Sequence, residues 1–133
     1  MKSRPEENRT VADLMTQDMI ALRPNDRIGR ARDIILTLGI HALPVMMDND
    51  VVGIVTSTDL VEDWPDDDAV QTVMTSSPYA VNAETSVREA ADLMNERRIH
   101  HLLVEAGGEV IGILSSLDLL RALVVSPTSD PAR

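Results

Sequence analysis

The feature that most constrains the fold of this chain is an internal duplication. The ten residues Val51–Leu60, VVGIVTSTDL, recur 59 residues later at Val110–Leu119 as VIGILSSLDL. The flanking sequence repeats at the same offset without an insertion, so that Val11–Met15 corresponds to Val70–Met74. A repeat of fewer than about 60 residues rarely buries a sufficient core alone, so we expect two similar halves related by a pseudo-twofold axis within one unit.

Each repeat has the pattern of a short α/β unit. Apolar residues recur at helical spacing over Ile28–Leu38 and over Val87–Arg97, which predicts a helix in each repeat, the first one capped by Asp26. Two apolar runs flanking a polar turn then predict an antiparallel hairpin in each repeat. After each hairpin we expect a second helix, beginning near Leu60 in the first repeat and covering Asp118–Val125 in the second.

The predicted boundaries follow the repeats. They are an N-terminal tail (1–9), the first repeat (10–61), an acidic linker (62–69), the second repeat (70–125) and a C-terminal tail (126–133). The linker contains three consecutive carboxylates, Asp66–Asp68. We interpret it as a solvated loop rather than a cation site, because successive carboxylates in such a loop rarely converge on one ion.

The overall composition excludes several classes of protein. Hydrophobic residues make up 44% of the 133 residues and charged residues 26%, which is a globular balance. A net charge of −10 argues against binding to nucleic acid or to an anionic membrane. The chain has no cysteine, no apolar signal segment, and no apolar run near the ~18 residues that a membrane span needs. We therefore expect a soluble, cytoplasmic protein.

A hydroxyl and a carboxylate three residues apart follow the last predicted strand of each repeat. They are Thr56 with Asp59, and Ser115 with Asp118. A carboxylate can accept hydrogen bonds from both hydroxyls of a ribose, and a helix beginning at the same place offers N–H groups to a phosphate. The same residue types are also common helix caps, so both a ligand contact and a structural role remain open for these pairs.

A compact basic cluster precedes the second hairpin. His100 and His101 follow Arg97 and Arg98, and we interpret them as contacts for a phosphate, with a solvated face as the alternative. His41 corresponds to His100, but the first repeat lacks the other basic residues. The two repeats are therefore not equivalent, and the second has the better phosphate site.

Gly53 and Gly112 occupy the same position of the two repeats. A glycine in a strand permits a close approach of another group, either a ligand or protein. We favour packing between the two halves as the reason for these glycines.

Taken together, these residues resemble a known family. The matching pieces are Asp13–Thr16, Gly39–Val45, Gly53–Thr56 and Asp59 in the first repeat, and Val73–Thr75, Arg97–Val104, Gly112–Ser115 and Asp118 in the second. Each repeat resembles a CBS motif, and the pair resembles a stand-alone tandem CBS module (Bateman module) over about residues 10–125.

The resemblance implies a fold and a ligand. The fold would be α/β, with two pseudo-twofold-related β-α-β-β-α units packed through their sheets. The ligand would contain adenosine (AMP, ADP, ATP, S-adenosylmethionine or NAD) and lie in a cleft between the halves. Carried over by position, Thr56 with Asp59 and Ser115 with Asp118 would hold ribose and phosphate, His41, His100 and His101 would lie beside them, and the adenine contacts would be Thr16, Ile20, Ala21, Thr75, Tyr79 and Ala80.

No catalytic machinery is apparent. The sequence has neither a P-loop nor a G-x-G-x-x-G loop, no nucleophile with a supporting base, and no histidine spacing typical of zinc. We therefore predict no catalytic residues, no metal ligands and no obligatory cofactor. The leading hypothesis is a sensor whose adenosine ligand alters a surface presented to a regulated protein, in a homodimer. The alternative is a ligand-independent dimerisation or interaction module that pairs through Val87–Arg97 and Leu119–Val125.

Overall fold

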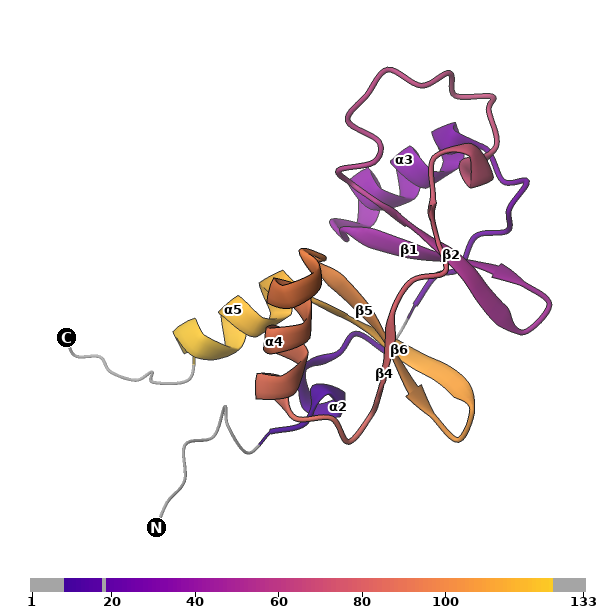
Figure 1. Ribbon diagram of the computed structural model, residues 1–133. Helices are drawn as coiled ribbons and strands as arrows, with labels where there is room; N and C mark the ends of the chain where they lie inside the picture. The colour runs from indigo at the N-terminus through magenta and orange to yellow at the C-terminus, as the bar shows by residue number, and fades with distance from the viewer. Residues whose placement is uncertain (1–8, 18, 126–133) are drawn as a thin grey trace, which may run out of the picture. The chain divides into compact units, whose positions relative to one another are not determined.

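The structure of the protein, a computed structural model, describes residues 9–17 and 19–125 (Figure 1). The predicted tails, Arg9 excepted, lie outside the described residues. The chain folds as two compact units. Of the described residues, one unit comprises 19–78, and the other combines 9–17 with 79–125. Each unit contains a three-stranded sheet, so the predicted α/β class is confirmed.

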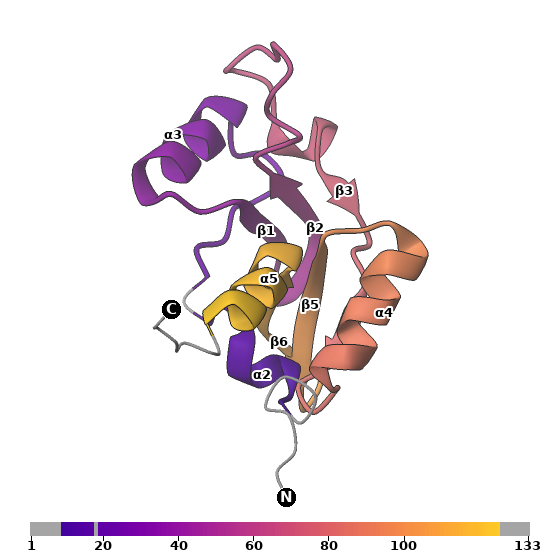
Figure 2. The same cartoon turned by 90° about the vertical axis from the view of Figure 1, so that its left-hand side faces the viewer.

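The unit of residues 19–78 is built around the first hairpin. Helix α3 (Ile28–Leu38) is followed by β1 (Ala42–Met47) and β2 (Asp50–Thr56), and the chain returns after a short 3₁₀ turn (Val70–Thr72) as β3 (Thr75–Ser76). The sheet has the order β1-β2-β3, all antiparallel, with β3 lying along β2 (Figure 2). Its core is aliphatic and consists of Leu22, Ile28, Ala31, Ile35, Leu43, Val45, Val55, Leu60 and Val70.

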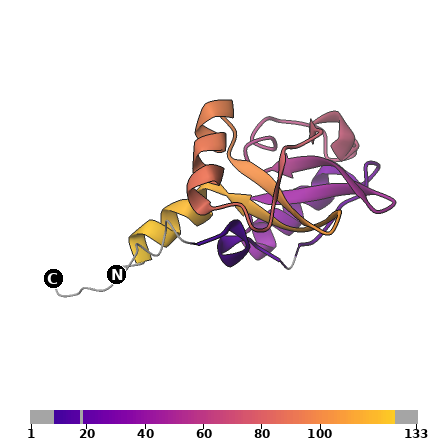
Figure 3. The ribbon, with the colours of Figure 1, turned by 60° about the horizontal axis from the view of Figure 1, so that its bottom comes forward.

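Among the described residues, the other unit has three α-helices, whereas the first unit has one. It contains α2 (Val11–Leu14), β4 (Ala80–Asn82), α4 (Val87–Arg97), β5 (His101–Ala106), β6 (Glu109–Ser115) and α5 (Ser116–Val125). Strand β4 pairs with β5 in parallel and β5 with β6 antiparallel, and α4 contacts α5, the orange and yellow helices of Figure 3. The order from β4 to α5 is the β-α-β-β-α order that the resemblance implies. Its core consists of Val11, Ala90, Met94, Leu102, Val104 and Leu114.

The N-terminal segment of the chain packs on the second repeat. The N–H of Val11 donates to the carbonyl of Thr85 (2.8 Å), and the N–H of Val87 donates to the carbonyl of Arg9 (3.0 Å). The first backbone N–H of α4 is therefore satisfied by a residue far away in sequence. Val11 itself is fully buried in the core of the second repeat's unit.

The segment that precedes the second repeat packs on the first repeat in the same way. The N–H of Val70 donates to the carbonyl of Asp26, and the N–H of Ile28 donates to the carbonyl of Asp68, both at 2.8 Å. The N–H of Gly29 donates to Asp66 (3.0 Å). The segment at the start of each repeat thus packs on the other repeat, which we call the exchange of leading segments. For this reason each compact unit contains residues of both repeats.

The two strand glycines receive the exchanged segments. A Cβ atom on Gly112 would lie 2.6 Å from Sδ of Met15 and 2.9 Å from the carbonyl oxygen of Thr16. A Cβ atom on Gly53 would meet the side chain of Met74 in the same way. Each glycine therefore packs against a segment of the other repeat, within one compact unit. The prediction that these glycines serve packing between the two repeats is confirmed.

Two helix predictions need correction. The carboxylate of Asp26 does not cap α3, because it accepts from the N–H of Arg23 (2.8 Å) while Asp68 serves the first N–H of the helix. No helix begins near Leu60, where turns run instead. Pro65 follows closely, and because a helix interior excludes proline, a helix as long as α5 could not continue through this segment. By contrast α4 forms over the predicted residues, with a capping box at Ser86, and α5 begins at Ser116, two residues before the predicted Asp118.

Candidate functional site

The hydroxyl–carboxylate pair of the second repeat lies where β6 ends and α5 begins. Two hydrogen bonds close the backbone over Ser115–Asp118, which is here called the second-repeat loop. The N–H of Ser115 donates to Oδ2 of Asp118 (2.8 Å), and the N–H of Asp118 donates to Oγ of Ser115 (3.0 Å). The N–H of Ser116 donates to the carbonyl of His100 (2.8 Å). The capping role considered for this pair is therefore real. Among the described residues the bond from Ser115 uses only Oδ2 of Asp118, so Oδ1 still has the capacity to accept a hydrogen bond.

Other predicted contacts of this unit gather at the same end of its sheet. Thr16 pairs with Ile113 through two backbone hydrogen bonds (2.9 and 3.1 Å), two residues before Ser115. His101 stands directly opposite Ser115 in the register of β5 and β6. Nδ1 of the exposed His100 lies 3.3 Å from Oγ of Ser116. The loop thus carries hydroxyl, carboxylate and imidazole groups within a few residues of one another.

Tyr79 and Ala80 lie at the start of β4. Ala80 is aligned with Leu103 of β5, whose N–H donates to the carbonyl of Tyr79 (2.9 Å). The tyrosine side chain is 44% exposed, and the guanidinium of Arg97 lies over its ring, 5.0 Å from the centroid. A cation over an aromatic face is an attractive arrangement. The basic cluster at the end of α4 is thereby joined to the predicted adenine-contacting residue.

The first repeat builds a matching loop in the other unit. The N–H of Thr56 donates to Oδ2 of Asp59 (2.9 Å), and the N–H of Asp59 donates to Oγ1 of Thr56 (3.2 Å). The carbonyl of the exposed His41 accepts from the N–H of Ser57 (2.9 Å), as that of His100 does from Ser116. Thr75 lies opposite Ile54 in the pairing of β3 with β2.

The remaining predicted contacts of this unit, Ile20 and Ala21, are exposed residues that immediately precede Leu22. Leu22 bridges in parallel to Val45 of β1, much as β4 lies beside β5 in the other unit. The thirteen predicted residues therefore divide by unit rather than by repeat: Thr16 joins the second-repeat loop and Thr75 joins the first-repeat loop.

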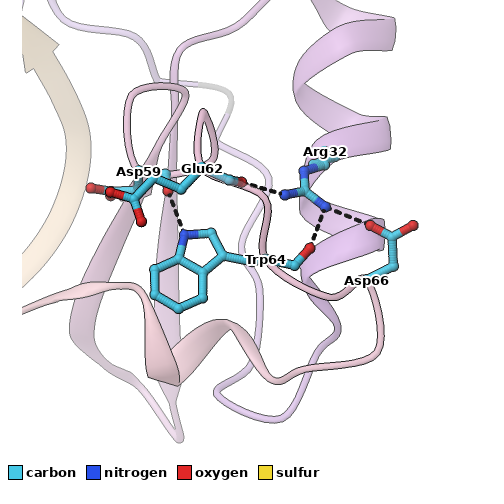
Figure 4. A network of polar contacts seen from close by, with 5 residues as sticks. All are labelled: Arg32, Asp59, Glu62, Trp64 and Asp66. Atoms are coloured by element: carbon cyan, nitrogen blue, oxygen red, sulfur yellow. Dashed lines mark hydrogen bonds and ion pairs between the residues drawn. The ribbon is translucent and has the colours of Figure 1, made fainter.

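Sequence reasoning missed two residues that support the first-repeat loop, Arg32 and Trp64 (Figure 4). The indole N–H of Trp64 donates to the backbone carbonyl of Asp59 (3.2 Å). The guanidinium of Arg32 donates to the carbonyls of Trp64 (3.0 Å) and Glu62 (2.9 Å) and to the carboxylate of Asp66 (2.5 Å). The sequence did contain a signal for this contact, because Trp64, the single tryptophan of the chain, stands in a polar linker. A large aromatic side chain normally packs against apolar groups, so its presence indicates that the linker folds back onto the core.

A shallow depression of about 490 Å³ lies at the N-terminal end of α3, away from the predicted residues. It is lined by Asn25, Asp26, Arg27, Gly29, Arg30, Asp33, Asp66 and Asp67. The N–H groups of Ile28 and Gly29 already bind carbonyls of the linker, so the helix end has little to offer an anion.

Within the described part of the chain, no group of three or more metal-ligating side chains converges. No helix in that same part is long and apolar enough to cross a bilayer.

Comparison with known proteins identifies the family. The sequence matches the CBS domain over residues 11–65 and again over residues 70–125. The chain belongs to the CBS-domain family. As a pair of CBS domains it is similar to an inosine-5'-monophosphate dehydrogenase of Korarchaeum cryptofilum, with 33% identity over 104 residues. That match covers 77% of this chain but only 22% of the dehydrogenase, so this CBS pair spans about a fifth of that relative.

Solved CBS structures have the same fold. A signal-transduction protein with CBS domains from Burkholderia ambifaria is 28% identical, with a TM-score of 0.79 over 92% of this chain and 96% of that one. CBSX2, whose crystal structure is a complex with AMP, is 28% identical, with a TM-score of 0.74 over 86% of this chain and 96% of that one. The tandem CBS prediction is therefore confirmed.

Proposed function

We propose that this CBS pair is a regulatory module that binds an adenosine-containing ligand at its two hydroxyl–carboxylate loops. The observation that carries the proposal is the matched geometry of the loops at Thr56–Asp59 and Ser115–Asp118. In each loop one carboxylate oxygen is used to hold the loop closed, which leaves the other to accept from a ribose hydroxyl. The AMP complex of CBSX2 supports the choice of ligand class.

The two loops differ in the charge around them. His100 lies beside the second-repeat loop and follows Arg97 and Arg98 in the sequence. His41 of the first repeat follows Leu38 and Gly39 at the corresponding positions. Opposite charge favours a phosphate, and the contribution of a charge-assisted hydrogen bond exceeds that of a neutral one. We therefore assign the phosphate-bearing ligand to the second-repeat loop and expect the first-repeat loop to prefer an uncharged adenosine moiety.

A thermal-shift panel with AMP, ATP, NAD and S-adenosylmethionine tests the proposal. A ligand at 100 times its dissociation constant stabilises the folded state by about 2.7 kcal/mol, which is a readily measured rise in melting temperature. Asp118→Asn is the informative variant, because asparagine also caps helices while it lacks the carboxylate charge. Asp92→Asn on the exposed face of α4 is the matched control. The proposal requires a shift that Asp118→Asn reduces and Asp92→Asn does not.

A second candidate function is a ligand-independent dimerisation module. It is favoured by α5, where Leu117, Leu120 and Leu123 are 37%, 56% and 54% exposed. Their spacing places them on one face of the helix, so they form an apolar strip. Sedimentation analysis of Leu120→Lys with and without AMP separates the two candidates. A dimer that this variant disrupts, together with no thermal response to any adenosine ligand, would favour dimerisation alone.

A further inference from the structure

The linker Glu62–Asp68, here called the strap, folds back over the first-repeat unit in place of the missing second helix. Besides the backbone bonds from Ile28 and Gly29 to its carbonyls, two side chains attach it close to the first-repeat loop. Trp64 packs against the core of the unit, and its indole N–H reaches the backbone carbonyl of Asp59. Arg32 of α3 binds two strap carbonyls and the carboxylate of Asp66 (Figure 4). We call Arg32 and Trp64 together the clasp.

The contacts of Arg32 fix the backbone of the strap relative to α3. Its side chain is only 24% exposed, whereas that of its partner Asp66 is 72% exposed. An exposed ion pair alone contributes little to stability, but a planar guanidinium that binds two carbonyls fixes the path of a backbone. Arg32 thus holds Trp64 in the position from which its indole reaches Asp59.

The position of Asp59 matters because its carboxylate and N–H both belong to the first-repeat loop. The backbone carbonyl that Trp64 binds belongs to the same residue as the predicted ribose-binding carboxylate. In the second repeat the positions of Arg32 and Trp64 are taken by Ala91 and Leu123. The second-repeat loop has α5 behind it instead, so the clasp is specific to the first repeat.

We propose that Arg32 and Trp64 are positioning residues that hold the Thr56–Asp59 loop in its binding geometry, a role in ligand affinity that rests on the proposed function. Ligand binding at this loop and closure of the strap are then thermodynamically linked, and each favours the other. The ligand state of the first repeat is thereby transmitted to the acidic surface of the strap.

Backbone hydrogen exchange measured by NMR without ligand tests the positioning role. In Arg32→Gln and in Trp64→Phe, which keeps an aromatic ring but loses the indole N–H, the Asp59 amide is expected to exchange at least about tenfold faster. Arg32→Lys keeps the charge without the planar fork and restores only part of the protection. Arg30→Gln, on the same helix, is the matched control and leaves the rate unchanged.

Two internal references exclude a general loss of stability. The amides of the β1–β2 ladder and the Asp118 amide of the second-repeat loop are expected to keep their wild-type rates. Unchanged exchange at Asp59 in both clasp variants, or equal acceleration throughout the β1–β2 ladder, would overturn the positioning role.

The linkage to ligand is read from the single indole N–H resonance of the chain. AMP or adenosine is expected to shift this resonance in the wild type. Arg32→Gln is expected to weaken binding at the first-repeat loop by at least about threefold. Binding at the second-repeat loop is expected to remain unchanged in this variant. If the wild type binds neither compound at either loop, the proposed function fails and the linkage with it, whereas the exchange rates alone decide the positioning role. If the second-repeat loop binds ligand and the indole resonance never moves, the linkage alone is refuted.

Discussion

The exchange of leading segments between the repeats can be tested at Gly112. Replacing it with alanine places a Cβ atom 2.6 Å from Sδ of Met15 and 2.9 Å from the carbonyl oxygen of Thr16. Ordinary contacts between heavy atoms are about 3.5–4.0 Å, so the N-terminal segment must move away from β6. Overpacking of this kind costs about 1–3 kcal/mol, less about 0.4–1 kcal/mol that alanine recovers by restricting the unfolded chain.

A double-mutant cycle isolates the contact itself. The free energy of unfolding is measured by urea denaturation, followed by circular dichroism, for Gly112→Ala, Met15→Ala and the double variant. Met15→Ala removes the group that the new methyl would strike and leaves only the contact with the carbonyl of Thr16. We expect the double variant to be more stable than additivity predicts by at least about 1 kcal/mol, within the range of coupling between residues in contact.

The control for this cycle is Glu109→Ala, an exposed substitution on the same strand. It is expected to change the free energy of unfolding by less than about 0.5 kcal/mol. Additive effects of Gly112→Ala and Met15→Ala would refute the packing of the N-terminal segment on the second repeat.

Three further predictions concern local features. Ser86→Ala removes the side chain that accepts from the N–H of Glu89 (3.0 Å) and should lower stability in urea denaturation by about 1 kcal/mol; an unchanged midpoint would contradict a capping role. Arg98→Gly should raise the melting temperature, because this residue has φ of +57°, a conformation that costs a non-glycine residue about 1–2 kcal/mol; a lower melting temperature would show that the arginine side chain contributes more than its backbone strain costs. Asp67→Ala breaks an ion pair with Arg27 in which both side chains are largely exposed, so the urea midpoint should hardly move, and a loss above about 1 kcal/mol would show that the pair is more than a surface contact.

Local signals predicted much of the secondary structure. The helical spacing of apolar residues found α3 and α4, and the glycine after α3 adopts the left-handed conformation expected at a helix end (φ of +66° at Gly39). Polar turns between β-branched runs found both hairpins. These elements depend on residues that are close in sequence, so a local pattern of residue types is enough to predict them.

The errors came from long-range contacts. Asp26 is a suitable cap by residue type, but a carbonyl 42 residues away, that of Asp68, serves the first N–H of α3 instead. The residues after Thr56 match those that begin α5, yet the strap replaces the helix because Trp64 and Arg32 fix its path. The division of the predicted site by unit has the same cause, since nothing local to Thr16 shows that it pairs with Ile113.

The most direct test of the account is to map AMP binding on the backbone amide resonances of the whole chain. We expect the largest shifts in the Ser115–Asp118 loop and at His100, with smaller shifts in the Thr56–Asp59 loop. In Asp118→Asn we expect the changes at the second-repeat loop to be weaker. Shifts confined to the depression at the start of α3, or an unchanged spectrum at millimolar AMP, would contradict the assignment of ligand binding to these loops.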